Sequence, residues 1–305
     1  MTLPPAPEAR GRAEAGLATV FVALSAAGFA AISTFVLLAT RAGAPLLTVL
    51  SWRYIIAAVV LASIAGLTGH LRGPTRPAVG VLVVGGFGQS LVAIITLIAL
   101  SFIPAATLSF LFYTYPGWVA IIARVRHSEP LTPVRMFALA LSLTGIFVMV
   151  GSPGSASLHP VGVGLALLGG FLYAIYVPMM NELQRPLTPV ATATYMSVGA
   201  AVLLAVTAAV RTEFAFRMSA TAWYPILGLA LISTVGAFLV FLRGLRVLGP
   251  LRTAIISTIE PFFTAVLGAW LLSQPMTSAT LIGGALIAGA VILLQLPTAS
   301  NSGRS

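Results

Sequence analysis

The chain has 305 residues, of which 59% are hydrophobic and only 7% are charged, and its mean hydropathy is +1.05. A soluble domain of this length carries far more charge on its surface, so the composition excludes a water-soluble globular protein and predicts a protein that lies in lipid. All 16 basic residues are arginine, all 6 acidic residues are glutamate, and the absence of cysteine excludes disulfide and thiol chemistry.

Ten apolar runs follow one another along the chain, each of roughly 20 residues, the length that a helix needs to cross the hydrocarbon core of a bilayer. Because backbone amides in lipid must be hydrogen-bonded within their own segment, these runs are expected to be helices. The expected spans cover residues 15–39, 46–68, 78–100, 104–124, 134–151, 161–183, 189–210, 222–244, 251–272 and 278–296. The polar segments 1–14 and 297–305 are expected to be cytoplasmic tails, the first of them disordered.

The arginines indicate how these spans are oriented. With the N-terminus in the cytoplasm, only Arg41, Arg53, Arg211 and Arg217 fall on the outer side, and the other 12 of the 16 fall inside. The positive-inside rule therefore places both termini in the cytoplasm. The net charge of +10 comes from arginines that lie at the ends of the expected helices and do not gather on one soluble face, so nucleic acid is not an expected partner.

The chain contains an internal repeat, because residues 101–132 return 145 positions later as residues 246–277. The matched positions include Tyr115 with Glu260, Pro116 with Pro261, and Glu129 with Gln274.

Ten spans divide into two repeats of five, over residues 15–151 and 161–296, and an odd number of spans turns the second repeat upside down relative to the first. The sequence thus predicts an all-α polytopic membrane protein of ten transmembrane helices, arranged as two inverted five-helix repeats. Such duplication is typical of secondary transporters, whose substrate site lies near the bilayer midplane.

Polar side chains in the middle of a span need a partner or a water-filled cavity, so they are candidates for a substrate site. The residues expected to bind substrate are Gln89, Tyr113, Tyr173, Ser233, Thr234, Ser257, Thr258 and Glu260. For Gln89, a hydrogen bond that ties two helices together is an equally good interpretation. Tyrosines near helix ends can instead anchor the chain at the membrane interface.

Glu260 is the only acid expected well inside a span, where a charge costs about 2.5–3.5 kcal/mol. It could face the cavity and either attract a substrate ammonium group or take up a proton during transport. It could instead bind backbone amides freed by the neighbouring proline, or pair with an arginine of another helix. Tyr115 takes its place in the first repeat, so the repeated framework does not require a carboxylate.

Pro116 and Pro261 lie near the middle of matched spans, and each removes one helical hydrogen bond. A kink is therefore predicted at both positions. Matched discontinuities in two repeats point to a binding site or a moving gate, whereas a kink that serves packing alone is the simpler interpretation. The glycines at 85, 86 and 88 predict the close approach of another helix.

Two further features leave alternatives open. Arg53 could reach a substrate carboxylate, but it is expected to extend toward the lipid headgroups. The small-residue pairs Gly284 with Ala288 and Ala285 with Gly289 could form a dimer face or pack within one chain, so monomer and homodimer both stay open.

Residues 99–150 and 244–295 resemble the EamA-type repeats of the drug/metabolite transporter superfamily. The resemblance is carried by Ile259-Glu260-Pro261 and by the pattern from Glu129 to Thr132, from which the second repeat departs at Gln274. The length and the short loops look most like bacterial amino-acid exporters of the YddG type. The resemblance implies a location in the bacterial inner membrane and a central cavity lined mostly by the third, fourth, eighth and ninth helices.

The resemblance and the polar residues together predict a secondary transporter that exports small amphipathic metabolites, above all neutral or aromatic amino acids, by alternating access. Transport of a drug, a nucleoside or a lipid-linked sugar is the alternative on the same fold. An enzyme is not expected, because the three histidines lie in loops and no Asp or Cys is available for a metal cluster or a triad. No catalytic residue, metal or cofactor is assigned, and the expected partners are a small-molecule substrate and the bilayer.

Overall fold

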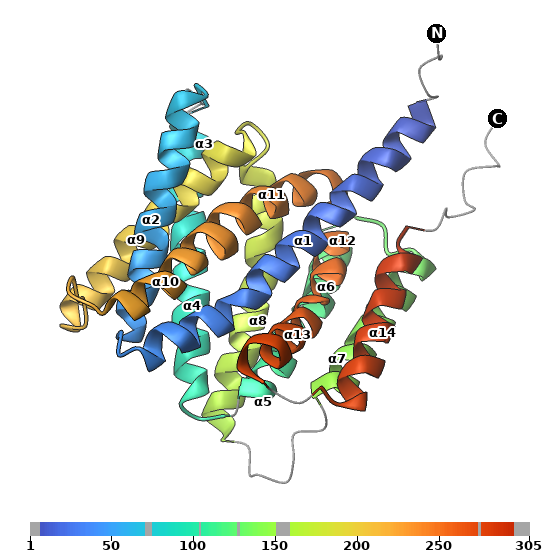
Figure 1. Ribbon diagram of the computed structural model, residues 1–305. Coiled ribbons are helices and arrows are strands. Elements are labelled where there is room, and N and C mark those ends of the chain that lie inside the picture. The colour runs from blue at the N-terminus through green and yellow to red at the C-terminus, as the bar shows by residue number, and fades with distance from the viewer. Residues whose placement is uncertain are drawn as a thin grey trace.

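The structure is a computed structural model, which describes residues 7–70, 75–103, 105–126, 129–150, 159–273 and 276–295. All regular structure in these ranges is helical, so the prediction of an all-α chain is confirmed for them. The helices pack into one bundle (Figure 1). The expected C-terminal tail and residues 1–6 lie outside the described ranges.

The first half of the chain, up to residue 150, forms eight helical elements. They are α1 (Pro7–Arg41), α2 (Leu46–Leu67), α3 (Thr75–Gly80), the π-helix η1 (Val81–Gly85), α4 (Gly86–Leu100), α5 (Ala105–Phe112), α6 (Tyr115–Val125) and α7 (Pro133–Val150). Helix α1 begins at Pro7 and so includes part of the segment expected as a disordered tail. The reason is local, since Pro7 suits a first helical turn and the alanines, glutamates and arginines that follow favour a helix.

The second half repeats this order element for element. Its elements are α8 (Pro160–Leu183), α9 (Pro189–Val210), α10 (Ala220–Ala230), the π-helix η2 (Leu231–Gly236), α11 (Ala237–Leu248), α12 (Pro250–Ser257), α13 (Glu260–Leu272) and α14 (Ser278–Leu293). By length and composition, seven helical stretches of the described chain could cross a membrane, and α7 and α14 are shorter apolar helices. The chain is therefore a multi-pass membrane protein.

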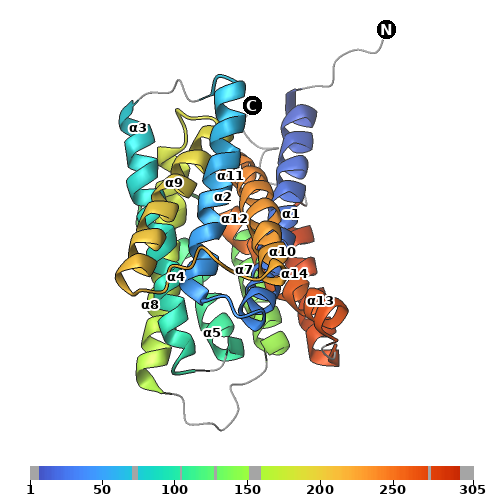
Figure 2. The same ribbon diagram turned by 60° about the vertical axis from the view of Figure 1, so that its left-hand side comes forward.

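Corresponding elements of the two halves make corresponding contacts. Helix α7 packs along α14, and α2 packs along α9 (Figures 1 and 2). The first helix of each half crosses to the other half, since α1 contacts α10, α11 and α13 whereas α8 contacts α4, α5 and α6. The two halves are thus interleaved, and the interior of the bundle is formed by both.

Two matched breaks interrupt the helices in the interior. Residues 113–114 form a turn between α5 and α6, and residues 258–259 form the corresponding turn between α12 and α13. Pro116 and Pro261 occupy the first turn of the helix that follows each break. The predicted kinks are therefore present as short interruptions, because a proline ring cannot donate the hydrogen bond that would continue the helix.

Each half also carries one π-helix, η1 or η2, in its third long helical stretch. In η2 the hydroxyl of Thr234 donates a hydrogen bond of 3.0 Å to the carbonyl oxygen of Leu229, five residues earlier. A π-helix inserts an extra residue into a helical turn and is found most often at functional sites. These two elements were not predicted from the sequence.

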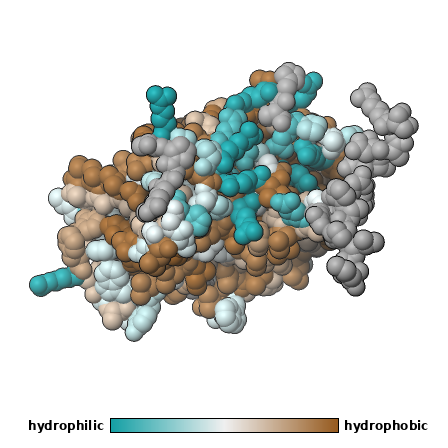
Figure 3. Space-filling view, turned by 90° about the horizontal axis from the view of Figure 1, so that it is seen from above, coloured by the Kyte–Doolittle hydropathy of each residue, from teal (hydrophilic) through white to brown (hydrophobic). Residues whose placement is uncertain are grey.

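The surface of the bundle divides by polarity. Seen from above, hydrophilic residues gather on the end face of the bundle, while hydrophobic residues cover much of its flanks (Figure 3). Exposed apolar side chains such as Val59, Ile121 and Val202 lie in the middle of their helices. This distribution fits flanks that contact lipid and ends that reach the membrane surface.

Candidate substrate-binding site

The two helix breaks bring residues of both halves together. Tyr113 lies in the first break, and Glu260 begins the helix after the second break. The hydroxyl of Tyr113 lies against the carboxyl group of Glu260. The structure therefore places two of the expected substrate-binding residues in direct contact, although they are far apart in the sequence.

A cluster of aromatic side chains surrounds this contact. Tyr115 and Tyr173 meet edge to face with ring centroids 4.9 Å apart, and Tyr173 stacks on Tyr176 at 5.8 Å. Phe112 lies 5.5 Å from Tyr173, and Tyr113 lies 6.0 Å from Tyr115. We call residues 112, 113, 115, 173 and 176 the aromatic cluster. Their flat faces and hydroxyl tips suit a solute that is partly apolar and partly polar.

The hydroxyl groups of this cluster have few strong partners. Tyr115 donates to the carbonyl oxygen of Ala254 at 3.3 Å, and Tyr176 donates to that of Gly85 at 3.5 Å, both at the long end of the hydrogen-bond range. Tyr115 also lies close to the side chain of Ser257. A bound solute with polar groups could therefore compete for these hydroxyls at small cost.

The position of Arg53 differs from the one expected. It was expected to extend toward lipid headgroups, but only 4% of its surface is exposed. Its Nε donates to Thr234 Oγ1 at 2.7 Å, and its Nη2 donates to the carbonyl oxygen of Ser233 at 3.4 Å. Its guanidinium carbon lies 4.8 Å from the ring centre of Tyr54. The reason is that η2 presents a hydroxyl and a carbonyl oxygen to α2, so the arginine finds its partners inside the bundle.

Arg53 and Glu260 share the electrostatic environment of the site. The positive charge of Arg53 acts on the carboxyl group of Glu260. Neither side chain forms an ion pair within 4.0 Å among the described residues. Tyr54, which lies beside Arg53, interacts electrostatically with Tyr173 and Tyr176. The site therefore holds one positive and one negative group that do not touch, with tyrosines near both of them.

The expected serines and threonines have different surroundings. Thr234 is engaged by Arg53, whereas the buried hydroxyl of Ser233 has no hydrogen-bond partner in the described chain. The hydroxyl of Thr258 donates to the carbonyl oxygen of Ile255 at 2.6 Å within its own turn, and Ser257 lies against Tyr115. Of these four residues, Ser233 and Ser257 have hydroxyl groups that a ligand could use.

Gln89 lies on α4 and is partly exposed, and its side chain forms no hydrogen bond with the described residues. The described residues show no hydrogen bond between Gln89 and the aromatic cluster, although the neighbouring Gly88 packs on the Tyr176 ring, 2.6 Å from where a side-chain carbon would lie. A carbon added to Gly86 would lie 2.7 Å from the backbone nitrogen of Ala200 in α9. The glycine cluster therefore serves helix packing, as its spacing predicts.

The small-residue pairs of α14 have a neighbour within the same chain. A side-chain carbon added to Gly284 would lie 2.2 Å from the ring of Phe262, so this glycine packs against α13. The structure therefore gives one of the two pairs an intramolecular role.

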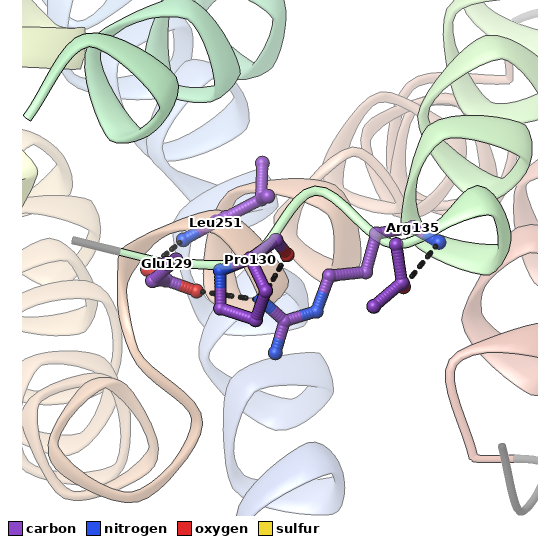
Figure 4. A network of polar contacts seen from close by, with 5 residues as sticks. Glu129, Pro130, Arg135 and Leu251 are labelled. Carbon is purple, nitrogen blue, oxygen red and sulfur yellow. Dashed lines mark hydrogen bonds and ion pairs between the residues drawn. The ribbon is translucent and has the colours of Figure 1, made fainter. Parts of the chain in front are cut away.

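A polar network at one end of the bundle joins the loop after α6 to the start of α12 (Figure 4). Glu129 accepts a hydrogen bond of 3.0 Å from the backbone N–H of Leu251, and Arg135 Nη1 lies 3.3 Å from Glu129 Oε2. Arg135 also donates to the carbonyl oxygen of Pro130 at 2.9 Å. Burial raises the pKa of Glu129, against the lowering effects of the Leu251 N–H and of Arg135. The corresponding Gln274 lies outside the described residues.

An apolar groove of about 550 Å³ lies between α1, η2, α11 and α13. It is lined by side chains that include Leu24, Thr34, Phe35, Ile232 and Trp270, and no member of the aromatic cluster lines it. Three of these residues, Leu24, Ile232 and Trp270, are more than half exposed, so the groove opens on the lipid-facing flank. The groove is therefore separate from the aromatic cluster.

Arg53, Tyr54 and Tyr176 lie in or beside the aromatic cluster but were not among the residues expected to bind substrate. Arg53 and Tyr54 lie within the span expected over residues 46–68, and an arginine inside a span is itself a signal of function. Tyr176 lies three residues after Tyr173, so both share one face of α8. Both signals were available in the sequence, and the assumption that arginine extends toward the headgroups concealed the first of them.

Known proteins are similar to this chain in sequence and in fold. The model of the EamA-like transporter family matches residues 17–151 and 160–296. The chain is 28% identical to the uncharacterized inner membrane transporter YicL of Salmonella typhimurium, over 72% of this chain and 74% of the relative. It is 25% identical to the uncharacterized transporter sll1319 of Synechocystis, over 74% of this chain and 70% of the relative. A crystal structure with 19% sequence identity has the same fold, with a TM-score of 0.73 over 89% of this chain and 96% of the other.

Proposed function

Because this chain belongs to the EamA-like transporter family, we propose that it is a secondary transporter with ten membrane-spanning helices arranged as two inverted five-helix repeats. The ten spans are the seven long stretches together with α5–α6, α7 and α14. The 16 residues of α14 measure about 24 Å along the axis, slightly less than the hydrocarbon core of about 30 Å, which a locally thinner bilayer accommodates. The close pairing of α7 with α14 supports the same role for both.

The substrate that we propose is a neutral or aromatic amino acid, exported as by carriers of the YddG type. The observation that carries this proposal is the meeting of the two helix breaks at the aromatic cluster and Glu260. Aromatic faces favour a flat apolar side chain, and a carboxyl group favours an ammonium group. The first half contributes three residues of the aromatic cluster, and the second half contributes the other two together with Glu260. A site built by both halves fits a position at the interface of two repeats.

Alternating access follows from the same breaks. Each broken stretch has two helices joined by a two-residue turn, in which Thr114 and Thr258 donate to the carbonyl oxygen three residues earlier in place of the α-helical four. Pro116 or Pro261 lacks the N–H that would continue the helix. Hinges of this kind absorb backbone rotation while the flanking helices stay intact. We infer that α5–α6 and α12–α13 bend in turn at these hinges, so that the site opens to one side of the membrane at a time.

We place both termini in the cytoplasm of a bacterial cell. Several arginines at helix ends bind groups of other elements there. Arg126 pairs with Glu182 at 3.1 Å, Arg246 donates to the carbonyl oxygen of Gln184 at 2.8 Å, and Arg252 donates to that of Leu294 at 2.8 Å. Arginine accumulates on the cytoplasmic side of inner-membrane proteins, which supports this orientation.

The test is an efflux assay with the full chain reconstituted in liposomes. The liposomes are loaded with labelled neutral or aromatic amino acids, and efflux is recorded with and without a pH gradient. We expect saturable efflux that a Tyr173→Ala variant reduces and that an Arg243→Gln variant, changed at the exposed surface, retains. Efflux that requires a proton gradient would show proton coupling and make Glu260 the leading candidate for the coupling residue. The absence of efflux for every amino acid would contradict the proposed substrate.

A second candidate substrate is a lipid-linked sugar, and the apolar groove favours it. A lateral opening between helices would admit a molecule whose tail stays in the bilayer, and the groove between α1 and α13 opens on the flank of the bundle. A Leu24→Trp substitution would narrow the groove, which the mostly exposed Leu24 lines. Loss of transport of a lipid-linked sugar in this variant, with amino-acid efflux unchanged, would favour the second candidate.

A further inference from the structure

Arg53 is a buried charge without a buried counter-charge in contact. A guanidinium group has five N–H donors, and hydrogen bonds of Arg53 engage two of them, which leaves three. No carboxylate among the described residues lies within 4.0 Å of it. Burying a charge in this way is costly unless a partner compensates it. The three remaining donors therefore indicate a binding role for this side chain.

The orientation of Arg53 is fixed by its neighbours. Thr234 accepts from Nε, and its own hydroxyl hydrogen is used by the Leu229 carbonyl oxygen. The Tyr54 ring lies beside the guanidinium group at 4.8 Å. A planar guanidinium group that is held through Nε and one N–H of Nη2, with a ring beside one face, can present its remaining N–H groups to a carboxylate in the paired geometry that arginine favours.

Ser233 supplies an independent sign of a missing ligand. Its side-chain oxygen is fully buried and has no hydrogen-bond partner in the part of the chain that the structure describes. Its backbone carbonyl oxygen accepts from Arg53, so the hydroxyl belongs to the same residue that the guanidinium group contacts. A buried hydroxyl without a partner loses free energy, and a bound polar group would restore that hydrogen bond.

The charges of the site select one kind of solute. Arg53 and Glu260 interact electrostatically but are not in contact, and the aromatic cluster lies beside Glu260. A phosphate or another anion would satisfy Arg53 and be repelled by Glu260, and a simple amine would do the reverse. A molecule with a carboxylate and an ammonium group on one carbon is complementary to both charges at once.

We propose that the site recognises the zwitterionic head of an α-amino acid, with its carboxylate bound by Arg53 and the Ser233 hydroxyl and its ammonium group bound by Glu260. The side chain of the amino acid then lies against the tyrosines of the aromatic cluster. This assignment rests on the proposed transport of amino acids and adds the residue that reads the carboxylate. It makes η2 a binding element, because the same π-helix positions Arg53 and supplies Ser233.

The test uses three ligands that differ in one charge each. Phenylalanine has both groups, phenylalaninamide lacks the carboxylate, and 3-phenylpropionate lacks the ammonium group. Binding of each to the purified full chain is measured by competition with labelled phenylalanine and, for every variant, by direct calorimetry. We expect the wild type to bind phenylalanine at least about tenfold more tightly than either analogue, because each charge-assisted contact is worth about one order of magnitude.

Variants identify which residue reads which group. Arg53→Gln should weaken phenylalanine and 3-phenylpropionate about tenfold and leave phenylalaninamide unchanged, and Glu260→Gln should weaken phenylalanine and phenylalaninamide but not 3-phenylpropionate. Arg243→Gln removes an exposed arginine and should change none of the three. If Arg53→Gln does not fold, Ser233→Ala should show the same selectivity with a smaller change.

The outcomes separate the two proposals. Tight binding of phenylalanine and phenylalaninamide alike by the wild type would overturn the role of Arg53 while leaving amino-acid transport in place. An equal loss of all three ligands in Arg53→Gln would also overturn it, since a merely positioning role of Arg53 on η2 affects every ligand. Failure of all three to bind the wild type, together with the absence of amino-acid efflux, would overturn the proposed function itself.

Discussion

The two π-helices pack on their neighbours differently, η1 through a close backbone contact at glycine and η2 through a buried arginine. Element η1 lies against α9 through glycine, and a side-chain carbon added to Gly199 would overlap the carbonyl group of Leu82. Element η2 lies against α2 through Arg53, which inserts between them and binds Thr234. The start of the second helix, Ala44-Pro45-Leu46-Leu47-Thr48, returns 144 positions later as Thr188-Pro189-Val190-Ala191-Thr192. At this offset Arg53 corresponds to Ser197, a buried serine whose hydroxyl has no partner among the described residues.

This difference shows how a duplicated framework can acquire a polar site. Both halves keep the π-helix, the second helix that packs on the other half, and the helix break with its proline. The charged side chains occur once each, as Arg53 in the first half and Glu260 in the second, where the matched positions hold Ser197 and Tyr115. The two halves therefore share their backbone geometry and differ in the charged side chains that this geometry positions.

The largest expected effect concerns the glycine contact of η1. Gly199→Val should destabilise the protein by about 3 kcal/mol or more, or prevent its folding, because the new side chain meets the backbone of Leu82, which cannot rotate away. Thermal unfolding and the yield of monodisperse protein in detergent measure the effect. The control is Gly236→Ala in η2, where the nearest atom lies at 3.4 Å and only a small change is expected. Comparable losses in both variants would show that η1 and η2 are packed alike.

The next effect concerns the polar contact of η2. Thr234→Val keeps the shape of the side chain but removes the acceptor for Arg53 Nε, so we expect a loss of about 1.5–3 kcal/mol in unfolding free energy. Thr258→Val is the matched control, because the Thr258 hydroxyl bonds only the carbonyl oxygen of Ile255 in its own turn. An unchanged melting temperature in Thr234→Val would mean that Arg53 is not held by η2.

The sequence alone predicts the framework better than the site. Apolar runs of membrane length and the proline pair place the helices and both breaks, because these features depend on the local chain. The contact between Tyr113 and Glu260 joins different halves, and only the resemblance to EamA-type repeats implied that their spans, the fourth and the ninth, line one cavity. Arg53 was misplaced because its preference for headgroups is general, whereas its two acceptors lie 180 or more positions away in the chain. The π-helices gave no signal in composition or periodicity.

A smaller effect concerns the polar network of Figure 4, where the two repeats differ by Glu129 and Gln274. Glu129→Ala removes the acceptor for the Leu251 N–H and the partner of Arg135, and we expect a loss of about 0.5–2 kcal/mol, as for other caps of a helix N-terminus. Glu129→Gln makes the first loop like the second and retains an oxygen that can accept from Leu251. Its loss, measured by thermal unfolding, should be smaller than that of the alanine variant, and the reverse order would exclude capping as the role of this residue.

The smallest expected effect is the pH dependence of the stability that Glu129 contributes, which also distinguishes Glu129 in the first repeat from glutamine in the second. Burial raises the pKa of Glu129 above its ordinary value of 4.5, so the folded protein holds this proton more tightly than the unfolded chain. The contribution of the group to stability is therefore fully present below the unfolded pKa and is lost as the pH rises through the folded pKa.

Since the side-chain amide introduced by Glu129→Gln does not titrate, the difference in melting temperature between wild type and variant isolates this proton. We expect the difference to move against the wild type as the pH rises from the unfolded pKa of Glu129 through its raised folded pKa, and then to level off. Other titrating groups are shared by both proteins and cancel. A difference that moves in favour of the wild type as the pH rises would mean that the positive charge of Arg135 outweighs the burial of the carboxyl group, and Glu129 would then act mainly as an ion-pair partner.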